Sequence, residues 1–571
     1  MQLHKVSGAV GNSYKYLIVN WGGHIAHAAF AIEQKNRAEE VFGPLATFLG
    51  FHPFKLESFP APYGKKPKYE ESYYWKEYTS LPQFDDFAKS GSVFKIFIKV
   101  RAVSTTLRVL AIAGLIALPG FSRRRFFLSI KNQKVRKLTL GAQIASDFLR
   151  NGEICNGRLE IGRDLIRVLY ECYLVAHYWL DVAPQIDFRQ LLFSNPETTY
   201  RNEIARRALL RRGASEIFSD RWAEGRFTLA TSHRFGSELS LCRPVSQSPV
   251  EIESARKDLL GRLSGNSRYI YMGTEDVDSR RVVQVVDARR ARRDVPRTKA
   301  VVFLHCVSDA QFLCGEDDCF ADLDDWLNCS LNILLAKGYD VYVKAHPAMF
   351  SDYNRRQYPI DGRYAEYLAT EKGLDWSGLA DGQIARSRDP RIWVVDTKLA
   401  IASLKQALGD FVAITHHGTV ATEAVGLRIP VVWSNANPAR QFPEFGFSYK
   451  TVKEYSRLLN LFRQGGLVID QQRFENCLRY LAASKNDYSV TVWTGFSRLA
   501  GQNIFADPDI YDNLVLSADP QRRPRLYAEI QELYGVGSIP SVALWKGEGG
   551  SEECRQADIN PARRASVPLR T

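Results

Sequence analysis

The chain has 571 residues, too many for a single hydrophobic core, so two large domains are expected. Hydrophobic residues make up 45% of it and aromatic residues 12%, which excludes a mainly disordered protein. A total of 76 Lys and Arg against 63 Asp and Glu gives a formal net charge of +13, so the surface favours an anionic partner: nucleic acid, a nucleotide substrate or an anionic membrane.

The cysteines and the N-terminus indicate a cytoplasmic protein. Nine cysteines are scattered along the chain, and none forms a C-x-x-C pair. An odd number without a pairing pattern argues against a disulfide framework, so reduced thiols are expected. The first residues lack the continuous apolar run of a secretory signal, and no such signal is expected.

The first half of the chain predicts a parallel sheet. An apolar strand near 14–21 is followed by a loop and by a helix over 28–43. The same order returns as a strand near 188–194, a helix ending at Gly213 and a strand near 215–218. Strand, loop, helix and strand in this order are the signature of a Rossmann-like domain, predicted here for residues 1–292.

Residues 51–135 are predicted to be an irregular, apolar insertion in that domain. Its uncharged part, Val109 to Phe121, is shorter than the roughly 20 residues that span a bilayer and contains Pro119. A buried helix and an element resting among lipid headgroups both fit, and a transmembrane helix fits least. The flanking cations are Lys95, Lys99, Arg101, Arg108, Arg123, Arg124 and Arg125.

A charged stretch marks the domain boundary. Its basic run, Arg289 to Arg293, is interpreted as part of an exposed linker, placed at 293–300, rather than as a nucleic-acid stripe. Residues 301–540 are predicted to form a second Rossmann-like domain whose last part, from 452, is mainly helical, and 541–571 to form a disordered tail. Strands are expected near 299–305, 339–345, 391–396, 410–415 and 429–433, and helices over 320–338, 399–409 and 419–427.

The segment 410–433 reads as strand, glycine turn, helix and strand. The backbone N–H groups of Gly418, Thr419 and Val420 would stand free at a helix N-terminus, which is an anion site, and Gly418 would let a phosphate approach closely. Glu423, about one turn further on, could accept hydrogen bonds from ribose hydroxyls. The alternative is an ordinary turn in which Glu423 is a favourable charge at a helix start.

Two other strand ends carry polar side chains. Lys344 and His346 alternate on their strand, so both should face the same side, near Gly418, where they could neutralise a phosphate and stabilise a leaving group. His346 could equally be structural. Asp309, after a third strand, could act as a base or cap the next segment, and the cap is the favoured interpretation.

A metal site was weighed at the same strand ends. His305, His346, His416 and His417 would all lie near this edge, and three converging imidazoles would suit zinc. Adjacent histidines usually point in opposite directions, and no H-x-x-x-H or cysteine pair supports the idea. No metal is therefore expected.

Three motifs in order, VFLHCVSDA, YDVYVKAHP and ITHHGTVATEAVGLRIPVV, resemble bacterial capsular and surface-polysaccharide synthesis proteins. These are GT-B glycosyltransferases related to Kdo transferases and, more distantly, to polyol-phosphate transferases of teichoic acid synthesis. The resemblance implies an α/β fold with two Rossmann-like domains facing across a cleft and a helical C-terminal extension. It further implies that His346 and Pro347 contact the donor nucleotide, that His417, Gly418 and Thr419 hold its phosphate, and that Glu423 lies near the ribose.

The resemblance predicts a glycosyltransferase that moves a sugar from a nucleotide-activated donor, with CMP as one candidate nucleotide, to a surface or capsular polysaccharide. His346 and Asp309 are the predicted catalytic residues, Lys344 joins the donor site, and no metal or cofactor is expected. The protein would be peripheral on the cytoplasmic face of an anionic membrane and act on a lipid-linked acceptor. The alternatives are a CDP-alcohol polyol-phosphate transferase and a nucleotide-sugar epimerase; nucleic-acid binding is disfavoured because the basic residues are dispersed.

Overall fold

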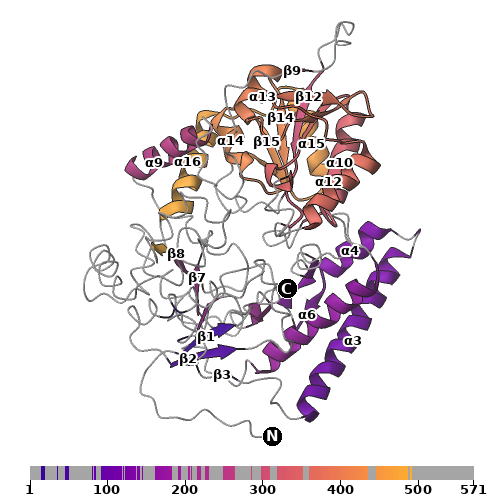
Figure 1. Cartoon of the computed structure of the whole chain (residues 1–571), viewed down its shortest axis with the longest axis vertical. Helices are drawn as coiled ribbons and strands as arrows, with labels where there is room; N and C mark the ends of the chain where they lie inside the picture. Colours follow the sequence, from indigo (N-terminus) through magenta and orange to yellow (C-terminus); the bar gives the residue numbers. More distant parts are fainter. Residues whose placement is uncertain are drawn as a thin grey trace, which may run out of the picture.

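Two sheets organise the chain in the computed structural model, one of seven strands and one of eight (Figure 1). The prediction of an α/β fold is confirmed. The structure describes residues 15–19, 32, 35, 46–50, 77, 80–81, 83–84, 92–118, 120, 122–136, 138–141, 144–145, 161–182, 191–194, 204–205, 207–208, 215–219, 226–230, 249–263, 284–285, 297–308, 318–350, 359–434, 445–486 and 489–491.

The first sheet is built from the predicted N-terminal strands. β1 (Lys15–Val19) lies between β2 (Ala46–Gly50) and β6 (Leu191–Ser194), and both pair with it in parallel. The parallel sheet expected from the sequence is thus confirmed, and of the helix expected over 28–43 the described Ile32 and Lys35 are helical. The remaining strands are β3 (Gln83–Phe84), parallel to β2, β7 (Ser215–Ser219), parallel to β6, and the antiparallel β8 (Arg226–Ala230) and β17 (Ser489–Thr491).

The second sheet contains every strand predicted after residue 298. Its order is β16-β15-β14-β10-β11-β13-β12-β9, and only the β12–β13 pair is antiparallel within the described strands. The bounds are β9 (Gln284–Val285), β10 (Lys299–Phe303), β11 (Asp340–Lys344), β12 (Gln383–Arg386), β13 (Ile392–Val395), β14 (Val412–Thr415), β15 (Val431–Ser434) and β16 (Phe447–Tyr449).

This sheet is buried on both faces, which explains its continuous Val and Ile runs. Because side chains alternate along a strand, Val302 and Val343 enter one core while Val301 and Tyr342 enter the other. The first core is covered by α10 (Leu323–Ala336), α12 (Pro359–Lys372) and α15 (Val452–Arg463). The second is covered by α9 (Pro249–Leu263), α13 (Ile401–Leu408), α14 (Val420–Gly426) and α16 (Gln471–Asn486).

Three of the described helices come between β3 and β6 in the sequence. They are α3 (Ser92–Ala117), α4 (Arg123–Lys131) and α6 (Arg163–Val182). α3 packs lengthwise on α6 and forms the outer edge of the molecule in Figure 1. The described part of the stretch 51–135, expected to be irregular, therefore contains α3, α4, the strand β3 and the strand β4 (Lys134–Val135), which pairs with β5 (Leu138–Thr139).

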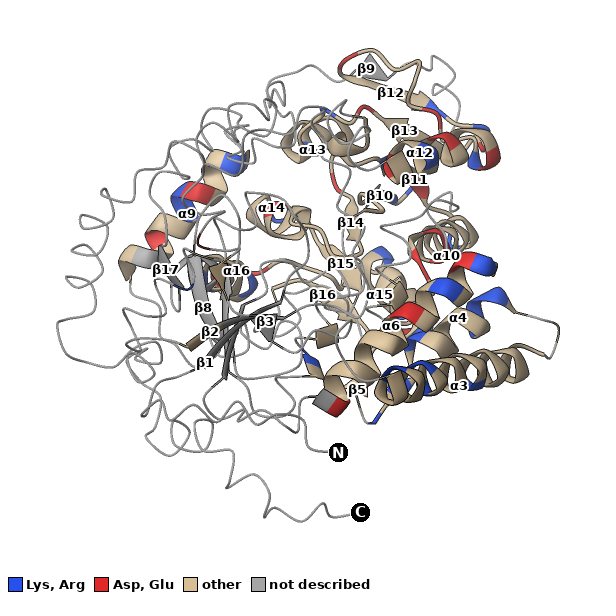
Figure 2. Cartoon of the chain, turned by 60° about the horizontal axis from the view of Figure 1, so that its bottom comes forward, with Lys and Arg blue, Asp and Glu red and all other residues tan. Residues whose placement is uncertain are grey.

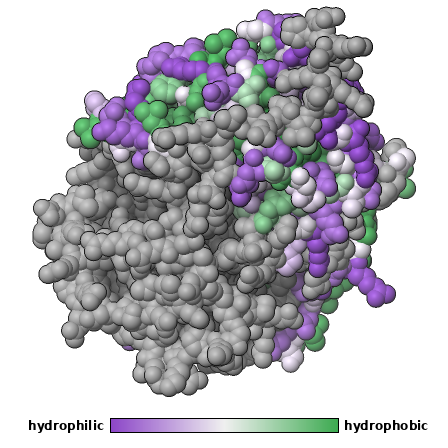
Figure 3. All heavy atoms as spheres, turned by 45° about the horizontal axis from the view of Figure 1, so that its top comes forward, coloured by the Kyte–Doolittle hydropathy of each residue, from purple (hydrophilic) through white to green (hydrophobic). Residues whose placement is uncertain are grey.

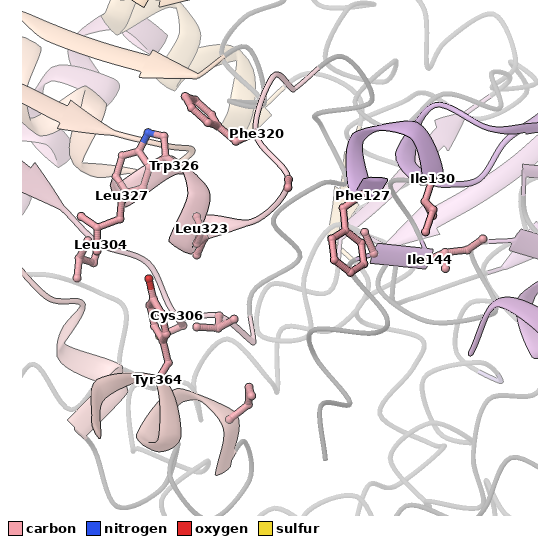
Figure 4. Packing of buried hydrophobic residues seen from close by; sticks show 14 of the residues in the cluster. Phe127, Ile130, Ile144, Leu304, Cys306, Phe320, Leu323, Trp326, Leu327 and Tyr364 are labelled. Carbon is pink, nitrogen blue, oxygen red and sulfur yellow. The ribbon is translucent and has the colours of Figure 1, made fainter. Parts of the chain in front are cut away.

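α4 connects this helical layer to the second sheet. Arg123 donates to Asp322 at 2.6 Å and Arg124 to Asp325 at 2.9 Å, both at the start of α10. Figure 4 shows Phe127 and Ile130 of α4 beside Ile144, across from the residues around Trp326 in the second sheet's core. Two long-range ion pairs thus fix the position of α4 relative to α10.

The chain passes between the two sheets more than once. α9 and β9 precede the predicted linker at 293–300, yet Leu259 of α9 lies in the core of the second sheet and β9 pairs with β12. After α16 the chain returns, and β17 pairs with β8 of the first sheet. The helical start of the region after 452 is confirmed by α15 and α16, and the predicted tail 541–571 lies outside the described residues.

Candidate functional site

The second sheet has a topological switch point at its centre. From β10 the chain continues to β11 and β13 on one side, and β14, β15 and β16 follow on the other. In open parallel sheets, ligands bind beyond the carboxyl ends of the strands at such a point. His305 follows β10, His346 follows β11 and His417 follows β14, so the three histidines stand at this edge.

The turn after β14 packs directly on His305. The rings of His305 and His417 are stacked with centroids 4.1 Å apart. Gly418 N–H donates to Thr415 Oγ1 at 3.2 Å, and the Thr415 hydroxyl lies 2.9 Å from His305 Nε2. His417 N–H also donates to His305 Nε2, at 3.4 Å. His305 Nε2 is therefore the acceptor of its ring, and burial with the neighbouring imidazoles holds the pKa of His305 well below its usual value.

This packing gives Gly418 a structural role. A Cβ at this position would lie 2.5 Å from His305 Cε1 and 2.9 Å from Thr415 Oγ1, closer than side chains pack. Only glycine lets the turn approach His305 in this way. The sequence predicted a free N–H at Gly418; the structure corrects this, because Thr415 accepts that N–H. Thr419 is exposed immediately before α14.

A buried chain of polar groups runs behind the turn. Asp318 Oδ2 lies 2.8 Å from His416 Nε2, and His416 Nδ1 lies 2.8 Å from His417 Nδ1. Asp318 also accepts from Ser434 Oγ at 2.9 Å, and its carboxylate is 3.9 Å from Lys131 Nζ of α4. Burial raises the pKa of Asp318, but His416, Lys131 and the hydrogen bonds outweigh it and hold that pKa below its usual range.

The polar chain ends at an unpartnered nitrogen. Among the described residues, no hydrogen-bond partner is found for His417 Nε2, although that atom is buried. Burial and the nearby His416 lower the pKa of His417 to about 3, so its ring is neutral. When His416 Nε2–H donates to Asp318, His416 Nδ1 accepts from His417 Nδ1–H, and His417 Nε2 keeps a free lone pair. A neutral imidazole oriented by a carboxylate through a second ring can act as a general base.

His346 presents the opposite hydrogen-bonding character. Its Nδ1 accepts from Ala348 N–H at 3.2 Å and lies 3.4 Å from Cys306 Sγ. The short helix η6 (Pro347–Phe350), which Pro347 opens, turns the Ala348 amide back toward the ring. Burial and Lys344 lower the pKa of His346 to about 4, so the ring is neutral and carries its proton on Nε2. His346 can therefore donate a hydrogen bond from Nε2.

Lys344 and Glu423 are electrostatic neighbours. Val343 enters the first core, so Lys344 faces the opposite side of the sheet, whereas His346 lies beyond the end of β11 and contacts Cys306 and Ala348 of the first core. Lys344 Nζ donates to Thr397 O at 2.6 Å, and burial lowers the pKa of Lys344 to about 8 against the opposing effect of Asp396 and Glu423. Burial raises the pKa of Glu423, against the opposing effect of Arg262 and Lys344.

Asp309, predicted as a catalytic residue or a cap, lies outside the described residues. Within the residues that are described, no group of three or more His, Cys, Asp or Glu could hold a metal ion. The sequence analysis missed Asp318 and Lys131, because neither stands in a motif or at a strand end. A cavity of about 520 Å³ opens beside Asp318 and is lined by Arg124, Leu128, Asn132, Asp318, Cys319, Thr451 and Val452, none of which is a predicted donor-site residue.

The sequence matches no protein-family model and no curated protein. Among solved structures, it is similar to the beta-Kdo 2,4 transferase KpsC of Thermosulfurimonas dismutans, with 13% identity, a TM-score of 0.28, and coverage of 51% of this chain and 78% of that one. It is also similar to HepE of Anabaena in complex with UDP-glucose, with 11% identity, a TM-score of 0.22, and coverage of 88% of this chain and 99% of that one. A third similar structure is a UDP-forming trehalose-phosphate synthase of Burkholderia vietnamiensis, with 12% identity, a TM-score of 0.25, and coverage of 82% of this chain and 93% of that one. At identities and TM-scores this low, the activity has to be argued from the site.

Proposed function

We propose that this protein is a GT-B glycosyltransferase that uses a nucleotide-activated sugar. The observation that carries the proposal is the group formed by Lys344 at the end of β11, His346 just after it and His417 after β14, at the switch point of a parallel sheet. Nucleotides bind at such points, and the buried cation of Lys344 with the Nε2–H donor of the neutral His346 suits a phosphate better than an apolar or cationic ligand.

Each predicted donor-site residue has a role in the proposal. Lys344 and the Nε2–H of His346 bind the phosphate oxygens, and Pro347 shapes the turn that orients His346. The turn of His417, Gly418 and Thr419 borders the phosphate, and Glu423 accepts from the ribose hydroxyls. Lys344 is the group that offsets the negative charge that develops on the departing phosphate, and no divalent metal is required.

The base for the transfer has two candidates. Asp309 is the one from sequence, and His417 Nε2, supported by Asp318 through His416, is the one with described contacts. In a direct displacement the acceptor oxygen bonds to the anomeric carbon and gives its proton to the base. The bond from that carbon to the phosphate oxygen breaks at the same time, and its electron pair leaves with the nucleotide.

The acceptor in this proposal is a surface or capsular polysaccharide, carried on a lipid at the cytoplasmic face of the membrane, and CMP is the first nucleotide to test. The net charge of +13 supports a location at an anionic membrane surface. In the described part of the chain one helix, α3, is long and apolar enough to cross a bilayer by length and composition, and 33% of its most apolar window is buried.

A thermal-shift panel of CMP, CDP, UDP and GDP, each with and without EDTA, tests the donor site. One nucleotide should raise the melting temperature in both conditions, and His346→Ala and Lys344→Met should abolish that rise while keeping the melting temperature of the free protein. Mass spectrometry of the reaction products then separates sugar transfer from polyol-phosphate transfer, and donor turnover without an acceptor would indicate an epimerase. If no nucleotide stabilises the protein, the proposal is wrong.

A further inference from the structure

The outward face of α3 is an apolar surface that none of the described elements covers. Its side chains at that face expose between 46% and 73% of their area, whereas Ile98, Ala102 and Val109 on the opposite face are buried against α6. At 3.6 residues per turn the exposed side chains other than Ile116 fall on one stripe along the helix. We call this the α3 stripe: Val93, Ile96, Phe97, Val100, Val103, Leu107 and Leu115, with Leu118 just after the end of the helix.

The stripe is long and lies at the edge of the molecule. The 26 residues of α3 give a length of about 39 Å at 1.5 Å per residue. In Figures 1 and 2 α3 forms an outer layer over α6, and Figure 3 shows hydrophobic residues at the surface on the same lower right side. A soluble protein rarely leaves so extended an apolar surface exposed unless something binds it.

The charge around the stripe identifies the partner. Between Ser92 and Arg136 there is no Asp or Glu and there are ten Lys and Arg, a bias visible as blue without red on α3 and α4 in Figure 2. By the helical period, Lys99 and Arg108 lie on the two sides of the stripe, and both are exposed. Five of the ten form ion pairs with other elements: Arg101, Arg123, Arg124, Lys131 and Arg136.

An apolar stripe with a cation on each side, in a segment that carries no acidic residue, matches an anionic membrane surface. Apolar side chains enter the acyl boundary while long basic side chains extend to the headgroup phosphates. A polar tie also holds α3 to the protein, because Thr105 Oγ1 lies 2.8 Å from the buried His177 Nε2 of α6. That bond favours a helix that stays packed on α6 and lies in the membrane plane over one that leaves to cross the bilayer.

We propose that the α3 stripe is the surface by which this protein binds an anionic lipid bilayer, with α3 parallel to the membrane. The proposal makes the membrane location given under the proposed function more specific, and it rests on the proposed function only for that location. Vesicle binding without sugar transfer would refute the transferase activity but not the membrane-binding surface. Sugar transfer without vesicle binding would refute the membrane-binding surface but not the activity.

Flotation of the purified full chain with vesicles tests the proposal. The protein should float with vesicles of phosphatidylcholine and 30% phosphatidylglycerol and much less with phosphatidylcholine alone. The partition coefficient of the triple variant I96E/V100E/L107E onto the anionic vesicles should be about 100-fold lower, because three apolar side chains are replaced by charges that anionic lipid repels. The matched control V250E/L260E/V468E carries the same charge change at positions exposed by 78%, 59% and 62% and should float like the parent protein.

Four results would overturn the proposal. The first is a parent protein that does not float with anionic vesicles, and the second is a stripe variant that floats as well as the control. Light scattering could find a lipid-independent dimer that the stripe variant converts to a monomer, which would make the stripe a contact between copies. Extraction from cell membranes by detergent alone, and not by high salt or alkaline carbonate, would make α3 a transmembrane helix.

Discussion

Asp318 is the residue whose removal should cost the most stability around the candidate site. Its carboxylate is fully buried, accepts from Ser434 and contacts His416 at 2.8 Å and Lys131 at 3.9 Å. The substitution Asp318→Asn keeps the shape and can keep the Ser434 bond, but it removes the carboxylate that pairs with the ammonium of Lys131, itself 1% exposed, and leaves only the aspartates at the start of α10 near that charge. Breaking a buried ion pair on one side costs about 3–5 kcal/mol. That is a large part of the roughly 5–15 kcal/mol that stabilises a domain.

Hydrogen exchange of β14 and α10 measures this loss locally, which avoids assuming two-state unfolding for so long a chain. A loss of 3–5 kcal/mol corresponds to exchange that is about 10² to 10⁴ times faster at pH 7. The double variant Lys131→Met/Asp318→Asn is the matched control. It should recover part of the protection, because no uncompensated charge remains buried.

The stability lost in Asp318→Asn should become smaller as the pH falls. Because the folded-state pKa of Asp318 is lowered, its contribution to stability is present above the unfolded value of about 4 and is lost as the pH falls through the lower folded pKa. The stability difference between the parent and Asp318→Asn should therefore shrink at pH 3. Equal protection of the two proteins at pH 7 would refute the assigned contacts, and so would a double variant as unstable as the single one.

Three further predictions concern neighbouring groups. Gly418→Ala should lower stability by about 1–3 kcal/mol, measured by urea unfolding, because its Cβ would meet His305; adding His305→Ala should relieve the clash, and a neutral single variant would contradict it. Nucleotide affinity by calorimetry should fall up to about tenfold per pH unit above about pH 8, where Lys344 loses its proton; Lys344→Arg should be flat there, and a parent protein equally flat would exclude Lys344 from the phosphate site. Asp322→Ala should lower the free energy of opening of α10, measured by hydrogen exchange, by about 1–2 kcal/mol or more, because Asp322 accepts the Asp325 N–H as an N-cap and also pairs with Arg123. Arg123→Ala removes only the ion pair and should lower this free energy less.

Local pattern was sufficient for the elements and for part of the site. Continuous Val and Ile runs predicted the strands of the second sheet, and a parallel sheet necessarily brings strand ends to one edge. The order of strands therefore predicted that His346 lies near the turn of His417 and Gly418. Alternation likewise predicted one face for Lys344 and His346, but His346 lies beyond the end of β11.

The contacts that give the site its chemistry depend on residues distant in sequence. Asp318 and His416 are 98 positions apart, and Lys131 comes from α4, a helix in a region that the sequence left irregular. Gly418 shows the same limit, because the nearest atom that excludes a Cβ there belongs to His305, which follows another strand, β10. No local pattern encodes such a pair, because each residue is compatible with the secondary structure of its own segment whether or not the distant partner is present.

The α/β pattern, the positive charge and the shared sheet edge at which the parallel strands end could be predicted, because they follow from composition and from the period of apolar residues. The buried face of α3 and the histidine that a carboxylate orients could not be predicted, because both depend on long-range packing. α3 is apolar on both faces, so its own residues do not distinguish inside from outside. Packing against α6 made that choice, just as the approach of β14, β15 and α4 placed Asp318 beside His416 and Lys131.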